Sequence, residues 1–190
     1  SCKARDAGAD SLLVVTPPYN KPNLSGLVKH FDYISRQAKM PICLYHVPGR
    51  TAQLLSAEAI REISSIDGIF SVKEASGDVA LFSRVVSLCP SKQIFTGDDP
   101  TYLPSLSVGG SGVVSVMTNA FPKAFVQMSK DFSSSNIASA TKLHQKFFPM
   151  IEALFCETNP VPVKAVLEMM GLCQGHLRLP LCPVSGENRV

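Results

Sequence analysis

The sequence predicts an α/β fold with a parallel sheet, specifically a (β/α)8 TIM barrel. Apolar, β-branched runs alternate with helical stretches at intervals of roughly 20 to 30 residues, the length of a βα unit. Each run also ends in polar or turn residues. A barrel gathers such residues from many strand ends onto one face, whereas an open sheet concentrates them at one switch point. A glycine-rich turn that opens a helix would favour the open sheet, but the glycines at 109–112 precede a strand.

Five runs are expected to form strands. The first, residues 11–16, is continuously apolar and ends at Pro17-Pro18, as a buried parallel strand does. The second ends at Pro48-Gly49. The expected strands are residues 11–16, 41–47, 69–75, 93–96 and 112–116.

Helices are expected between these strands and after the last one. Residues 24–38 have apolar positions at helical spacing, and Asn23 or Ser25 could cap that helix. Ser56 could cap the next helix, and Pro122 suits a first helical turn. The expected helices are residues 24–38, 56–64, 79–88, 100–107, 122–132, 137–155 and 161–170, the last with Gly171 as its C′ residue. The strand pattern ceases after residue 134.

Composition excludes several classes of protein. The 190 residues are 45% hydrophobic and 17% charged, with a formal charge of +3. Lys and Arg are scattered, so no nucleic-acid partner is expected, and no apolar stretch approaches the ~18 residues of a membrane span. The six cysteines form no C-x-x-C pair and no zinc spacing. We therefore expect no metal site, buried thiols in a reducing compartment, and a cytoplasmic protein.

The stretch Phe70–Asp78 contains the most reactive candidate. Lys73 lies among apolar and small residues at the end of an expected buried strand. Burial disfavours the ammonium form and lowers the pKa of a lysine, which frees the amine as a nucleophile. Such an amine can form a Schiff base with a carbonyl substrate. From this stretch alone, a surface lysine at a strand end is the alternative.

Six segments in order resemble the dihydrodipicolinate synthase family of Schiff-base-forming pyruvate aldolases and lyases. The similarity covers nearly the whole chain. The segments that carry it are Val15–Asn20, Leu44–Thr51, Val72–Asp78, Thr96–Asp99, Gly112–Val116 and Asn159–Lys164.

The resemblance implies roles for three residues in catalysis. Lys73 corresponds to the lysine that condenses with the keto group of pyruvate. Tyr45 corresponds to a tyrosine that faces this lysine and shuttles protons. Tyr19 corresponds to the tyrosine that reaches across a dimer interface to complete a proton relay in the neighbouring subunit.

It also implies residues that bind substrate. Arg50 corresponds to the arginine that binds the carboxylate of the aldehyde, a role that suits the guanidinium fork. Gly97 and Val114 correspond to backbone positions that line the pyruvate pocket.

The implied reaction joins pyruvate to aspartate semialdehyde and forms 4-hydroxy-tetrahydrodipicolinate, the branch point of lysine (diaminopimelate) biosynthesis. No cofactor is needed, because the iminium withdraws the electrons. The presence of Arg50 favours aspartate semialdehyde as the aldehyde substrate. Two alternatives stay open: another pyruvate-dependent aldolase or lyase, of the N-acetylneuraminate or 4-hydroxy-2-oxoglutarate type, or a non-catalytic barrel that binds a keto acid. The family resemblance also implies a homotetramer, a dimer of dimers.

The chain departs from the family pattern in three ways. The first three strands of the barrel are missing, with the Gly-Thr-Thr-Gly-Glu segment that binds the pyruvate carboxylate. We therefore expect residues 1–134 to be the C-terminal part of a barrel, strands 4 to 8 with their helices, and residues 135–190 to be a C-terminal helical extension. Gly49 stands where the synthases commonly have Ser or Ala. Pro18 replaces a tyrosine of the lysine feedback site in some relatives, which puts feedback inhibition in doubt.

Overall fold

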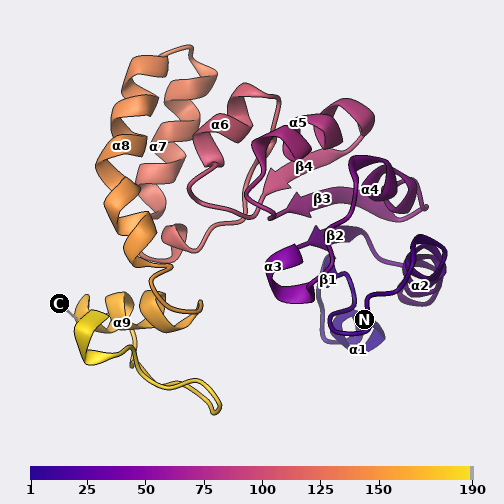
Figure 1. The fold of residues 1–190 in the computed structure, drawn as a ribbon, viewed down its shortest axis with the longest axis horizontal. Coiled ribbons are helices and arrows are strands. Elements are labelled where there is room, and N and C mark those ends of the chain that lie inside the picture. The colour runs from indigo at the N-terminus through magenta and orange to yellow at the C-terminus, as the bar shows by residue number, and fades with distance from the viewer. Residues whose placement is uncertain (189–190) are drawn as a thin grey trace. The chain divides into compact units, whose positions relative to one another are not determined.

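The computed structural model describes residues 1–188, which form two compact units (Figure 1). The first unit is Ser1–Val114 and the second begins at Ser115. We describe each unit by itself. Within residues 1–188, no helix combines the length and the apolar character needed to cross a membrane.

The first unit contains a five-stranded sheet in which every neighbouring pair of strands is parallel. The strands follow one another in chain order across the sheet. They are β1 (Leu12–Val15), β2 (Ile42–His46), β3 (Ile69–Glu74), β4 (Gln93–Thr96) and β5 (Gly112–Val113). Sequential parallel strands joined by helices are the arrangement of a (β/α)8 barrel wall, so the sheet has the predicted topology.

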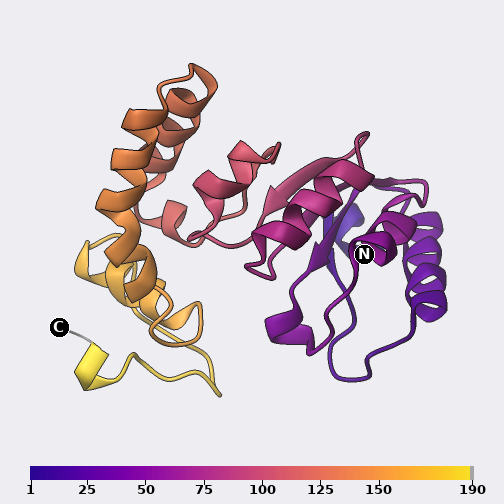
Figure 2. The same ribbon diagram turned by 45° about the horizontal axis from the view of Figure 1, so that its top comes forward.

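Helices cover one face of this sheet, where α2, α4 and α5 follow one another (Figures 1 and 2). The helices of the unit are α1 (Cys2–Asp6), α2 (Leu24–Ala38), α3 (Pro48–Thr51), α4 (Ala57–Ser64), α5 (Val79–Leu88) and α6 (Tyr102–Ser107). The core between sheet and helices includes Phe31, Ile42, Leu44, Ile60, Val72, Phe82 and Ile94. Because strand side chains alternate between faces, the residues next to Leu44 and Val72 point to the opposite face.

Side-chain caps begin three of these helices. Asn23, not Ser25, caps α2 by accepting a hydrogen bond from the backbone N–H of Gly26 at 2.9 Å. Ser56 caps α4 as predicted, and Asp78 caps α5 by accepting from Ala80 and Leu81. These bonds satisfy N–H groups that a helix leaves unpaired in its first turn.

Several local features differ from the sequence prediction. The thiols expected to be buried include Cys156, Cys173 and Cys182, which are exposed. The fifth strand is two residues long rather than five, because its partner β4 ends at Thr96, opposite Val113. One further ladder bond runs from the N–H of Val114 to the carbonyl of Thr96. Pro48-Gly49 ends the second strand as predicted, but these two residues also begin the helical turn α3, with proline in its first turn.

The second unit is helical. Its elements are η1 (Met117–Asn119), α7 (Pro122–Ser133), α8 (Ile137–Ala153), α9 (Val161–Met169) and η2 (Gly186–Asn188). Helices α7 and α8 pack side by side (Figure 2). Gly171 follows α9 with φ +70°, which confirms the predicted C′ residue. The boundary that we predict between the barrel and the C-terminal helical extension, after residue 134, falls inside this unit. The residue at which the barrel ends stays a prediction.

Candidate active site

Lys73 and Tyr45 lie side by side on neighbouring strands. The two residues are partners in the β2–β3 register, and the Lys73 Nζ atom is 4.1 Å from the centroid of the Tyr45 ring. Both side chains are half-buried and belong to the sheet face opposite the helices, since their neighbours Leu44 and Val72 are in the core. The predicted pair of residues is therefore in direct contact.

Burial shifts the pKa values of both groups. Burial lowers the pKa of Lys73 below its ordinary value, and the Arg50 charge lowers it further, while Cys43 and Asp99 act in the opposite direction. Burial also raises the pKa of the Tyr45 hydroxyl, and the Arg50 charge opposes that rise. The site thus favours the neutral amine and the neutral phenol, the forms that can attack a carbonyl and relay a proton.

Arg50 is positioned by α3. Pro48 begins this helical turn, and the N–H of Arg50 bonds to the carbonyl of Val47 at 2.9 Å. The Arg50 charge lowers the pKa of both Lys73 and Tyr45, so all three side chains belong to one site. A guanidinium beside a nucleophilic amine can bind a carboxylate of a substrate.

Gly97 packs directly against the lysine. A Cβ atom at this position would lie 2.5 Å from Cε of Lys73 and 2.7 Å from Cβ of Ala75. The N–H of Gly97 donates to the carbonyl of Glu74 at 2.7 Å, which fixes this close approach. The absence of a side chain at residue 97 leaves the space that the Lys73 side chain occupies.

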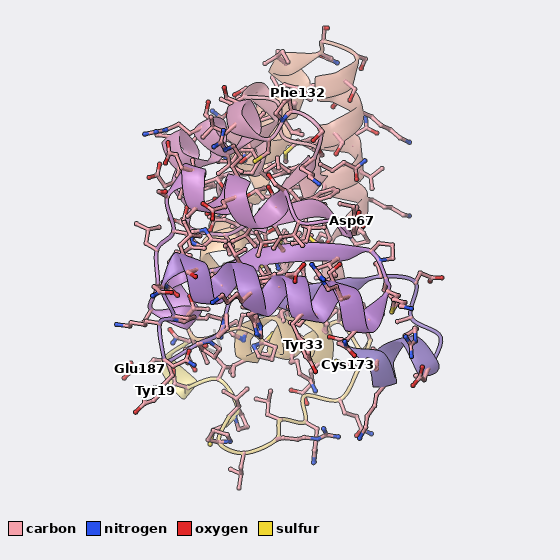
Figure 3. The ribbon with its side chains drawn as sticks, turned by 90° about the vertical axis from the view of Figure 1, so that its right-hand side faces the viewer. Tyr19, Tyr33, Asp67, Phe132, Cys173 and Glu187 are labelled. Atoms are coloured by element: carbon pink, nitrogen blue, oxygen red, sulfur yellow. The ribbon has the colours of Figure 1, made fainter. Side chains whose placement is uncertain are left out.

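Val114 and Tyr19 complete the predicted set. Val114 follows β5, beside the end of β4, and its side chain is exposed. Tyr19 lies in the loop after β1 with φ +72°, and its side chain is 93% exposed and projects into solvent (Figure 3). The structure therefore gathers Lys73, Tyr45 and Arg50, whereas Tyr19 stands apart in solvent.

Two further residues of this face were not singled out from the sequence. Cys43 and Ser71 precede Tyr45 and Lys73 by two positions and are partners in the same register. Cys43 interacts with Ser71 and Lys73, and burial raises the pKa of its thiol. The period-two alternation of strands would have placed both residues on the lysine face.

A metal site is not apparent in the described part of the chain. Among residues 1–188, His, Cys, Asp and Glu side chains form no group of three or more that could hold a metal ion.

Comparison with known proteins decides the family. The family model described as "Dihydrodipicolinate synthetase family" matches residues 1–190. The chain belongs to the dihydrodipicolinate synthetase family. A family member from Methanothrix thermoacetophila, named 4-hydroxy-tetrahydrodipicolinate synthase, is 44% identical over 187 residues. The match covers 97% of this chain and 63% of that protein.

Solved structures of this family have the same fold. The dihydrodipicolinate synthase of Thermotoga maritima matches with a TM-score of 0.95 and 38% identity, over 98% of this chain and 65% of that one. The Acinetobacter baumannii enzyme, described as complexed with pyruvate, matches with a TM-score of 0.93 and 37% identity, over 98% and 64%. The family fold is a TIM barrel, and the five strands of this chain are part of that barrel. The chain spans just under two thirds of these relatives' length.

Proposed function

We propose that this chain is the Schiff-base-forming part of a 4-hydroxy-tetrahydrodipicolinate synthase. The observation that carries the proposal is the half-buried Lys73 amine, whose pKa burial lowers, in contact with the Tyr45 ring. The activity is that of the completed protein, by which we mean this chain together with the third of its relatives' length that it does not match. The A. baumannii relative, described with pyruvate bound, supports pyruvate as the first substrate.

The reaction begins with the neutral amine of Lys73. Its nitrogen forms a bond to the keto carbon of pyruvate, and the carbonyl oxygen takes up a proton to give a carbinolamine. Loss of water leaves an iminium ion, which withdraws electrons so that a proton can leave the methyl carbon. The resulting enamine carbon attacks the carbonyl carbon of the aldehyde. No other electron acceptor is required.

Tyr45 and Arg50 assist different steps. The Tyr45 hydroxyl, whose neutral form burial favours, donates a proton to the hydroxyl group of the carbinolamine, which leaves as water, and then accepts a proton. Arg50 binds the carboxylate of aspartate semialdehyde. The amine of this substrate then attacks the former keto carbon, forms the ring and releases Lys73. Gly97 and Val114 line the pyruvate pocket through their backbones.

The exposed side chain of Tyr19 supports an assembly of several copies of the protein. A tyrosine that is 93% exposed in the isolated chain is available to a second copy. We assign it to the proton relay of a neighbouring subunit, in a homotetramer built as a dimer of dimers. The protein is a cytoplasmic enzyme in this account, and it uses no cofactor.

The test compares aldehydes. The completed protein is incubated with pyruvate and aspartate semialdehyde, and the product is followed by mass spectrometry. Cleavage of N-acetylneuraminate and of 4-hydroxy-2-oxoglutarate is measured in parallel. Condensation with aspartate semialdehyde, at least 10-fold faster than either cleavage, is the expected result for about 1.4 kcal/mol of discrimination by Arg50. Faster cleavage of either other substrate would assign the chain to another branch of the family.

A further inference from the structure

His46 and Glu74 form a buried pair directly behind the reactive residues. They follow Tyr45 and Lys73 in sequence and are partners in the same β2–β3 register. His46 is fully buried and Glu74 is 2% exposed. The His46 Nδ1 atom lies 3.0 Å from Glu74 Oε1.

The surrounding hydrogen bonds fix the direction of this contact. The N–H of Leu55 donates to His46 Nε2 at 3.0 Å, so that ring nitrogen carries the lone pair. The proton of the neutral ring is therefore on Nδ1, which donates to Glu74 Oε1. The same oxygen accepts a bond from the N–H of Ser76 at 2.9 Å. One continuous network thus joins the loop after α3 to the turn after Lys73.

Backbone bonds tie the same network to the next strand. The N–H of Ala75 donates to the carbonyl of His46, and the N–H of Gly97 donates to that of Glu74. The ends of β2, β3 and β4 are therefore connected at the level of the lysine. These strand ends set the distance between Tyr45 and Lys73, because Tyr45 directly precedes His46 and Lys73 directly precedes Glu74.

The polar character of the pair is unexpected from packing alone. Two residues earlier on the same face, the register partners Leu44 and Val72 are apolar and fully buried. Replacing a buried polar pair with apolar residues of similar volume is often neutral or stabilising, although here it would also leave the N–H groups of Leu55 and Ser76 without their acceptors. Their place beside the two reactive residues suggests another role.

We propose that His46 and Glu74 are positioning residues for imine formation. Their hydrogen bond fixes the end of β2 against the end of β3, and so holds the Tyr45 ring in place against the Lys73 amine. This inference rests on the proposed function, because it requires that Lys73 react with pyruvate. Neither residue touches the substrate in this account.

The test replaces the whole pair. The double variant His46→Leu/Glu74→Met of the completed protein removes both polar groups and leaves no unpaired charge. The variant His46→Asn keeps a donor for Glu74 and loses the bond from Leu55. Leu44→Ala is the matched control, since Leu44 is buried on the same face of the same strand. The measurements are the rate of adduct formation between pyruvate and Lys73, trapped with borohydride, its dependence on pyruvate concentration, and the midpoint of thermal unfolding.

The double variant is expected to unfold at a lower temperature, because the N–H groups of Leu55 and Ser76 lose their acceptors. It is also expected to form the adduct about 10- to 100-fold more slowly at saturating pyruvate, because a small misplacement of reacting groups is costly. His46→Asn is expected to recover most of the rate. Leu44→Ala is expected to unfold at a lower temperature with its rate changed by less than about threefold.

Each other outcome has a defined meaning. An unaltered protein that forms no adduct rejects the proposed function itself. Adduct formation in the unaltered protein, together with an equal rate in the double variant, overturns the positioning role alone. A double variant that fails to fold also overturns it, because the pair would then serve the fold, and so does an equal slowing in Leu44→Ala.

Discussion

The amine of Lys73 and the ring of Tyr45 are held together by the register of two parallel strands. Their side chains meet at 4.1 Å between Nζ and the ring centroid, although 27 residues separate them in the chain. Burial keeps the pKa of the lysine low and that of the tyrosine high. A phenol whose burial favours the protonated form, beside an amine whose burial favours the neutral form, is suited to carbinolamine dehydration.

Removing the Tyr45 hydroxyl tests this relationship. Tyr45→Phe keeps the ring against Lys73 but removes the proton donor, so adduct formation with pyruvate should slow by about 10²- to 10⁴-fold, the range of general acid–base catalysis. Tyr33→Phe is the control, because Tyr33 lies on α2 and is 66% exposed. Equal rates in Tyr45→Phe and the unaltered protein, measured by borohydride trapping over time, would exclude the hydroxyl from this step.

A side chain at residue 97 should displace the lysine. In Gly97→Ala the new methyl group would lie 2.5 Å from Lys73 Cε and 2.7 Å from Ala75 Cβ, so the lysine must leave its present position. We expect at least a 10-fold slower adduct formation, in keeping with the cost of misplaced reacting groups. Gly49→Ala is the matched control, because a Cβ there has no heavy atom within 4 Å. If the two variants react alike, the close approach of Gly97 has no role in placing the lysine.

The charge of Arg50 sets part of the pH dependence. A neighbouring cation disfavours the ammonium form, so Arg50 lowers the pKa of Lys73. Removing the charge in Arg50→Gln should raise that pKa, and the pH at which trapping reaches half its maximal rate should move upward. The pKa of Tyr45, which Arg50 also lowers, should rise as well. Trapping rates measured across pH, with the exposed Arg36→Gln as control, check the direction. A shift to lower pH is the contradictory result.

Asp78 stabilises the helix that follows the lysine turn. Its carboxylate accepts bonds from the N–H groups of Ala80 and Leu81, at 2.8 and 3.1 Å. Asp78→Ala should lower the free energy of unfolding by about 1 kcal/mol, the usual value of an N-cap. Asp78→Ser should recover most of this loss, since a hydroxyl can also cap. Urea unfolding measures both, and an unchanged stability in Asp78→Ala would refute the cap.

Most of the sheet could be predicted because its signals are local. The run that forms β1 is continuously apolar, apolar residues recur in the runs that form β2 to β4, and the caps Asn23 and Ser56 stand directly before their helices. The length of β5 could not be predicted from its own residues, because it depends on where its partner β4 ends. Helix α3 was also missed, since four residues are too few to show a period.

The candidate site was only partly accessible to sequence reasoning. The pattern around Lys73 drew attention to the lysine, but by itself it favoured a surface position, because the burial of this side chain depends on residues from other strands. Tyr45 and Arg50 became candidates through the resemblance to a family. The contact of Gly97 with Lys73, and the pair His46–Glu74, depend on strand register and loop packing. No periodicity in a single segment reveals such contacts.

Trapping the Schiff base shows directly whether Lys73 is the nucleophile. The completed protein is incubated with pyruvate, reduced with borohydride and digested, and the peptides are mapped by mass spectrometry. We expect one pyruvate-derived adduct, located on Lys73 and absent from Lys73→Arg. The absence of an adduct, or an adduct located instead on Lys21 or Lys92, would rule out Lys73 as the Schiff-base residue.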